Sequence, residues 1–115
     1  MTATQVATWV ADSADHPDTA PLLLDVREPW EFDTARIASA TLVPMSGIGA
    51  RIDEVGDLVD ASDGTRRPIV CICHHGVRSM QVANFLEQQG FARVVNMTGG
   101  IHSWSQQVDP SVPVY

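Results

Sequence analysis

The chain has 115 residues, which suits one domain with one core, and its 44% hydrophobic content excludes a disordered chain. The net charge is −7 and all seven basic residues are arginine, so no basic stripe is available for nucleic acid. No apolar run approaches the roughly 20 residues that cross a bilayer, and no secretory signal precedes the first helical pattern. We therefore expect a single cytoplasmic domain over residues 1–115, monomeric because it is small and acidic.

The first half of the chain alternates between helical and strand patterns. A capping box at residues 2–5 predicts a helix over about residues 4–11. The continuous apolar run at residues 22–26 is typical of a strand buried on both faces. A short helix is expected over residues 29–36, and a short strand ended by proline over residues 41–44.

The second half continues this alternation. Helical spacing predicts one buried face made of Ile48, Ile52, Val55 and Val59. A turn at 62–65 precedes the central strand at 69–73, and a helix over 79–89, ended by Gly90, precedes a strand at 93–97. A last helix face is formed by Ile101, Trp104 and Val108. Short apolar strands separated by helices predict an α/β fold, a parallel sheet with helices on both faces.

The most informative segment runs from Cys73 to Ser79, where the central strand is expected to turn into a helix. Ligands of parallel sheets bind at the carboxyl ends of strands. The amides of a first helical turn lack intrahelical partners and carry partial positive charge, so they favour a thiolate or a bound anion. Gly76 allows a positive φ that turns successive amides inward, and Arg78 adds a fixed charge. The segment predicts a reactive cysteine.

The segment also has two other interpretations. A cysteine at a strand end is often only a small buried hydrophobic residue. The pair His74 and His75, with Cys71 nearby, suggests a metal site, but structural zinc sites draw ligands from two separated segments and His16 and His102 are isolated in sequence. We expect no metal and no organic cofactor. The histidine pair is expected to shape the entrance of the loop and Cys71 to fill the core.

Three segments and the tail occur in an order that points to one family: Asp25–Phe32, Cys73–Ser79, Gly99–Ile101 followed by Trp104, and residues 108–115. With them the chain resembles the rhodanese family, the single-domain sulfurtransferases, over nearly its whole length. The resemblance implies a rhodanese-like, mostly parallel four- to five-stranded sheet flanked by helices on both faces. Because the chain begins almost directly with its first helix, we expect four clear strands and a vestigial fifth at the N-terminal edge.

The resemblance also implies a double-displacement reaction. The Cys73 thiolate attacks the outer sulfur of thiosulfate or another sulfane-sulfur donor, sulfite leaves, and a persulfide remains. A second nucleophile, either cyanide, a thiol or a thioredoxin-like protein, then takes the sulfur. By matching position, Cys73 is the nucleophile and Arg78 binds the substrate's sulfonate end and the persulfide. The cradle is formed by His74, His75, Gly76, Val77, Arg78 and Ser79.

Asp25 and Arg27 end a neighbouring predicted strand and are expected to support the site rather than to catalyse. Asp25 is expected to hydrogen-bond amides of the loop, and Arg27 to pair with Glu31. A structural network of hydrogen bonds and ion pairs is the simpler interpretation of both residues.

Three alternative functions remain open. The same residues would serve a sulfur-relay protein that carries persulfide from one protein to another. A non-catalytic regulatory module is disfavoured, because family domains of that kind generally lack the active cysteine and Cys73 is present. A cysteine phosphatase or arsenate reductase is disfavoured by loop length. Such enzymes place five residues between cysteine and arginine, whereas four, residues 74–77, separate Cys73 from Arg78.

Overall fold

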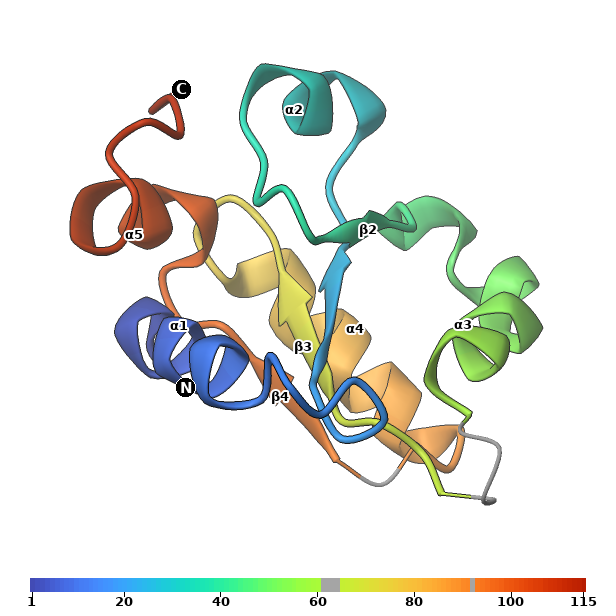
Figure 1. Cartoon of the computed structure of the whole chain (residues 1–115). Helices are drawn as coiled ribbons and strands as arrows, with labels where there is room; N and C mark the ends of the chain where they lie inside the picture. The colour runs from blue at the N-terminus through green and yellow to red at the C-terminus, as the bar shows by residue number, and fades with distance from the viewer. Residues whose placement is uncertain (61–64, 92) are drawn as a thin grey trace.

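The computed structural model describes residues 1–60, 65–91 and 93–115, and within them a four-stranded parallel sheet lies between two layers of helices (Figure 1). Across the sheet the strands are β2 (Thr41–Leu42), β1 (Leu22–Asp25), β3 (Ile69–Ile72) and β4 (Val94–Asn96). The register pairs Leu24 with Cys71, and Cys71 with Asn96. The predicted parallel α/β architecture is confirmed.

Two cores lie on opposite faces of the sheet, because successive residues of a strand point to opposite sides. The face of Leu22, Leu24, Ile69 and Cys71 packs against α3 (Ile52–Val59) and α4 (Val77–Gln88). The face of Leu23, Val70 and Ile72 packs against α1 (Ala3–Asp12) and α5 (Gly100–Gln107). Both strand faces are apolar for this reason, as the uninterrupted hydrophobic runs predict.

Several element boundaries differ from the sequence prediction for local reasons. The helix expected over residues 29–36 is α2 (Pro29–Thr34), because Ala35 has an extended backbone with φ −155°. The helix expected from Ile48 begins at Ile52, after the short 3-10 turns Met45–Gly47 and Gly49–Arg51.

The ends of one strand and one helix near proline and glycine can also be compared with the prediction. The strand expected over residues 41–44 is shorter: β2 ends at Leu42, although the Val43 amide still donates to the Asp25 carbonyl, and Pro44 precedes the 3-10 turn Met45–Gly47. Helix α4 was expected over residues 79–89; it begins two residues earlier, at Val77, and ends at Gln88, close to Gly90 with its φ of 96°. The turn predicted at residues 62–65 falls mostly on residues 61–64, which lie outside the described residues.

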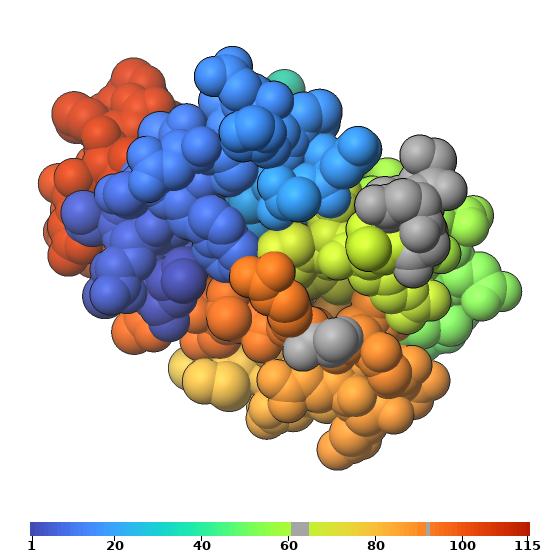
Figure 2. Space-filling view, turned by 60° about the horizontal axis from the view of Figure 1, so that its bottom comes forward, coloured from blue at the N-terminus to red at the C-terminus, as the bar shows by residue number. Residues whose placement is uncertain are grey.

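Met1 and Thr2 take the place of a fifth strand. Thr2 makes an isolated parallel bridge to Thr98, and the Thr98 amide donates to the Met1 carbonyl at 2.8 Å. Figure 2 shows these first residues, in dark blue, lying beside the orange segment that contains β4. The vestigial edge strand is confirmed, as is the capping box of α1, in which the Gln5 amide donates to Thr2 Oγ1.

Within the described ranges, no helix is both long and apolar enough to cross a membrane. The carboxyl ends of β1 and β3 lie at the same end of the sheet, because the strands are parallel and paired in register. Helix α2 and the end of the chain lie at that same end (Figure 1). The segments that follow β1 and β3 therefore meet there.

Candidate active site

Cys73 directly follows β3 and lies at the base of a short loop that leads into α4. Its sulfur accepts hydrogen bonds from the Gly76 amide at 3.0 Å and from the Ser79 hydroxyl at 3.2 Å. The residue is 1% exposed, so a reacting atom must enter the loop to reach it. Two donors aimed at one buried sulfur stabilise negative charge on that atom.

The first two carbonyls of the loop are hydrogen-bonded to amides of α5. The Ile101 amide donates to the Cys73 carbonyl at 2.9 Å, and the His102 amide donates to the His74 carbonyl at 3.1 Å. Gly100, with φ +58°, lies so close to the loop that an added Cβ would overlap the Cys73 carbonyl oxygen. A glycine is therefore required at the start of α5 for the loop to keep its shape.

Gly76 provides the turn that brings an amide back to the sulfur. It has φ 104° in the left-handed region, and a Cβ there would lie 3.2 Å from the Gly99 amide nitrogen. Asn96, at the end of β4, donates to the Gly76 carbonyl at 3.1 Å and accepts a hydrogen bond from Ser79. The Ser79 hydroxyl has one proton, so Asn96 and the Cys73 sulfur compete for it.

Arg78 does not stand free at the loop. Its two terminal nitrogens donate to the two carboxylate oxygens of Glu31, on α2, at 2.6 and 2.8 Å. The hydrogen bonds from Arg78 lower the pKa of Glu31 to about 2, against the opposing effect of burial. The Glu31 carboxylate is charged at neutral pH, and the paired charges stabilise each other.

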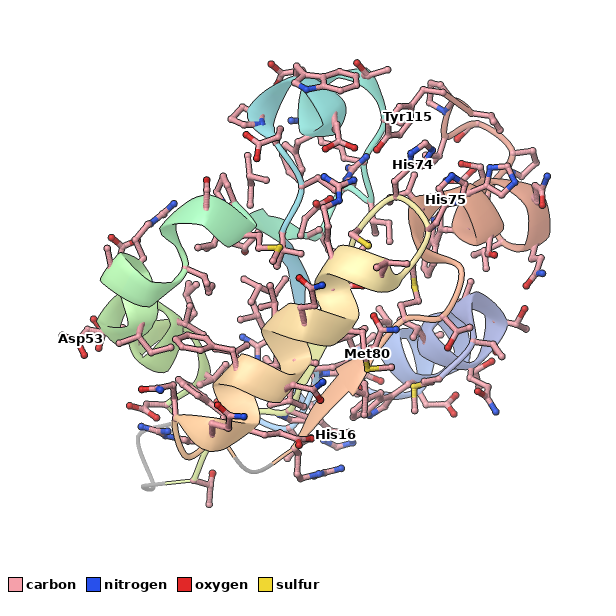
Figure 3. All side chains as sticks on the ribbon, turned by 180° about the vertical axis from the view of Figure 1, so that it is seen from behind. His16, Asp53, His74, His75, Met80 and Tyr115 are labelled. Atoms are coloured by element: carbon pink, nitrogen blue, oxygen red, sulfur yellow. The ribbon has the colours of Figure 1, made fainter. Side chains whose placement is uncertain are left out.

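The Tyr115 hydroxyl links Glu31 to Arg27, and the Tyr115 ring packs against the loop. Its hydroxyl donates to Glu31 at 2.7 Å and accepts a hydrogen bond from Arg27 at 2.8 Å. Its ring stacks on His74 with centroids 3.9 Å apart, and Figure 3 shows the two side by side. Burial raises the pKa of Tyr115 to about 12, so the phenol is a neutral donor at neutral pH.

Three imidazoles gather around the mouth of the loop. His75 lies 4.1 Å from His74 and 5.1 Å from His102 between ring centroids, so α5 contributes a histidine that is isolated in sequence. Burial lowers the pKa of His74, followed by the effect of His75, and Nε2 of His74 is buried without a hydrogen-bond partner. Among the described residues, no group of three or more histidine, cysteine or acidic side chains is arranged to hold a metal ion.

The family model described as "Rhodanese-like domain" matches residues 6–107 of the chain. The chain belongs to the rhodanese-like domain family. A protein named "Sulfurtransferase" from Allochromatium vinosum is 36% identical over 91 residues, a stretch that covers 79% of this chain and 78% of that protein. The family and this similarity support sulfur transfer in general.

Other curated relatives are much longer than this rhodanese-like domain. The "Rhodanese-like/PpiC domain-containing protein 12, chloroplastic" of Arabidopsis thaliana is 40% identical over 93 residues, which cover 81% of the chain and 30% of that protein. The "Adenylyltransferase and sulfurtransferase MOCS3-2" of Zea mays is 34% identical over 95 residues, which cover 82% of the chain and 19% of that protein. The chain thus spans less than a third of the length of these two relatives.

The rhodanese fold itself is supported by solved structures. The rhodanese-related protein from Thermoplasma volcanium superimposes with a TM-score of 0.71 at 28% identity, with 100% of this chain and 95% of that chain covered. The predicted rhodanese-like sheet and its flanking helices are therefore confirmed.

The roles predicted for Asp25 and Arg27 need correction. The Asp25 carboxylate binds the Arg27 guanidinium, at 2.7 Å for the closest pair, and not the loop amides. Arg27 contacts the main-chain carbonyl of Glu31, not its carboxylate, because that carboxylate is taken by Arg78. Asp25 and Arg27 are fully buried, so their place in the rhodanese-like domain is a structural ion pair under α2.

The predicted loop residues are brought together around Cys73, and further residues join them. His75 and Val77 face solvent, whereas Gly76 and Ser79 are buried against the sulfur. Four residues that were not predicted to do so contact the loop or Arg78: Glu31, Asn96, His102 and Tyr115. Glu31 and Tyr115 lie inside segments that carried the family resemblance, which was the available signal for them.

Proposed function

We propose that this rhodanese-like domain transfers sulfane sulfur through a persulfide on Cys73, with thiosulfate as donor and cyanide or a thiol as acceptor. The observation that carries the proposal is the pair of donors on the buried Cys73 sulfur, from Gly76 and Ser79. The same donors suit a thiolate before the transfer and a persulfide anion after it.

The proposed reaction has two displacement steps. The Cys73 thiolate attacks the outer sulfur of thiosulfate, the sulfur–sulfur bond breaks, and sulfite leaves with its electron pair. The persulfide Cys73–S–S⁻ carries the transferred sulfur. The acceptor then attacks the outer sulfur, takes it as thiocyanate or as a new persulfide, and restores the Cys73 thiolate. No external oxidant or reductant is consumed.

The protein supplies geometry and charge stabilisation for both steps. The α5 amides hydrogen-bond to the Cys73 and His74 carbonyls and hold the start of the loop in place. The Gly76 amide is already in place, so little reorganisation accompanies the change from thiolate to persulfide. His74, which stacks on Tyr115, lines the entrance.

A second candidate function is sulfur relay between proteins. It is favoured by the pairing of Arg78 with Glu31, which leaves the loop without a free arginine for an inorganic anion. A relay protein would accept the sulfur of a protein persulfide and use thiosulfate only slowly. Both functions use the same Cys73 chemistry and differ in the donor.

Steady-state kinetics test the proposal. With thiosulfate and cyanide as substrates, thiocyanate should form with parallel double-reciprocal lines, because sulfite leaves before cyanide binds. Intersecting lines would contradict a persulfide intermediate. The absence of turnover in a folded protein with free thiols would reject thiosulfate as the donor and shift the assignment to relay.

A further inference from the structure

Two arginines lie in or near the Cys73 loop, and each is already bound to a carboxylate. Arg27 binds Asp25, and both side chains are fully buried. Arg78 binds both oxygens of Glu31 in a two-point contact. Each pair is neutral as a unit. An anionic donor that enters the loop therefore meets amides and imidazoles, but neither arginine is free to bind it.

Glu31 is fixed in the position from which it holds Arg78. Its carboxylate accepts a hydrogen bond from Tyr115 at 2.7 Å and another from the Glu28 amide at 3.1 Å. The residue is 4% exposed, whereas the Arg78 side chain is 36% exposed. The Glu31 carboxylate is therefore the fixed partner of the pair. For Arg78 to bind an anionic donor, its guanidinium would have to move away from Glu31.

An anionic donor competes with Glu31 for Arg78. Thiosulfate carries one more negative charge than a thiosulfonate, R–SO₂–S⁻, although both present the same terminal sulfur. In each case the Cys73 thiolate attacks that sulfur, the sulfur–sulfur bond breaks, and the leaving group departs with the electron pair as sulfite or as a sulfinate. The extra negative charge of thiosulfate requires a compensating cation. The cation at this loop is Arg78, which is already bound to Glu31.

We infer that Glu31 is a specificity-determining residue that makes the site select monoanionic organic sulfane-sulfur donors, such as thiosulfonates and persulfides, over dianionic thiosulfate. The inference rests on the persulfide chemistry of the proposed function and ranks its donors: thiosulfate is a usable donor, and monoanionic organic donors are preferred. Glu31 acts through Arg78 and is a positioning residue, because it does not contact the reacting sulfur.

Aromatic side chains at the mouth of the loop fit the same donor class. The Tyr115 ring stacks on His74, and Trp30, 62% exposed, lies 5.9 Å from Tyr115 in an edge-to-face contact. These rings offer apolar surface to the organic part of a donor, which thiosulfate lacks.

The test compares kcat/KM for thiosulfate and for methanethiosulfonate, with cyanide as acceptor and at constant ionic strength. Each value is divided by the rate constant of the uncatalysed reaction of that donor with cyanide. Cyanide carries the same charge as the Cys73 thiolate, so the division corrects for the intrinsic reactivity of each donor. The wild-type protein should prefer the thiosulfonate. In Glu31→Gln the ratio of thiosulfate to thiosulfonate should rise about tenfold, because Arg78 becomes free to bind the second charge.

Two further variants isolate the charge effect. Glu28→Gln removes one negative charge from the N-cap of the same helix without touching Arg78, and its ratio should stay within about twofold of wild type. In the double variant E31Q/R78Q, which restores the local charge balance, the ratio should return toward the wild-type value.

An unchanged ratio in a folded Glu31→Gln protein would overturn the inference. If that variant does not fold, a wild-type preference for thiosulfate over the thiosulfonate would overturn it equally. Loss of the proposed function has a different signature, since neither donor would then give turnover that depends on Cys73.

Discussion

Cys71 and Cys73 are separated by one residue, yet their surroundings give the two thiols different chemistry. Cys71 lies within β3, packed among the apolar residues under α4, and burial, followed by the nearby Cys73, raises its pKa to about 12. The sulfur of Cys73 lies where the strand has ended, and it accepts hydrogen bonds from Gly76 and Ser79.

The difference comes from the backbone that surrounds each sulfur. Within the sheet, the amides next to Cys71 are used by β1 and β4. Beyond the end of the sheet, the first amides of α4 have no intrahelical acceptor, and Gly76 turns one of them toward Cys73. A displacement of two residues along the chain thus separates a core residue from a candidate nucleophile.

Replacing each cysteine in turn is the strongest test of this contrast. Cys73→Ser should lower sulfur transfer at least about a thousandfold, because a serine hydroxyl does not form a persulfide. Cys71→Ala should retain activity within about threefold and lose about 1 kcal/mol of unfolding free energy through a small cavity. Thiocyanate assays and urea unfolding measure both effects, and comparable activity loss in the two variants would refute the distinction.

Gly100→Ala tests whether α5 shapes the loop that gives Cys73 its donors. The added Cβ would overlap the Cys73 carbonyl oxygen, at a residue whose φ is +58°. We expect activity to fall about a hundredfold and unfolding free energy to fall by about 2–4 kcal/mol. Gly56→Ala is the matched control, because nothing lies within 4 Å of its added Cβ and its helix should gain stability. Equal behaviour of the two variants would show that the loop does not need this close approach.

The pH dependence of alkylation compares the two thiols directly. With a pKa of about 12, Cys71 stays protonated at pH 8, and its labelling should rise with each pH unit as its thiolate fraction grows. At pH 8 we expect iodoacetamide to label Cys73 at least about a hundredfold faster than Cys71, as read by peptide mass spectrometry. Faster labelling of Cys71 would reverse the assignment.

Ser79→Ala removes one of the two donors to the Cys73 sulfur and should have the smallest effect. The Gly76 amide remains, so we expect kcat/KM to fall about tenfold. Ser105→Ala is the control, since Ser105 is also a buried serine but donates to Pro113 in the C-terminal segment. Identical kinetics in the two variants would mean that the Ser79 hydroxyl serves Asn96 alone.

The local pattern of the sequence was sufficient to predict the fold and the place of the Cys73 loop within it. Apolar runs and helical spacing depend on neighbouring residues, so the parallel sheet and the Cys73 loop follow from them. Partner choice in the charged network does not. Arg78 binds Glu31 47 positions away, and Arg27 binds Tyr115 88 positions away. Several acidic groups could pair with Arg27 or with Arg78, and only the fold determines which carboxylate each arginine reaches.

The most direct test of the account is the intact mass of the protein after incubation with thiosulfate, and again after addition of cyanide. A persulfide at Cys73 predicts a gain of one sulfur atom, mapped to the peptide that contains Cys73, absent in Cys73→Ser and lost with cyanide. A gain that survives in Cys73→Ser, or that maps to Cys71, would contradict the central claim that the loop, and not the strand, makes the reactive sulfur.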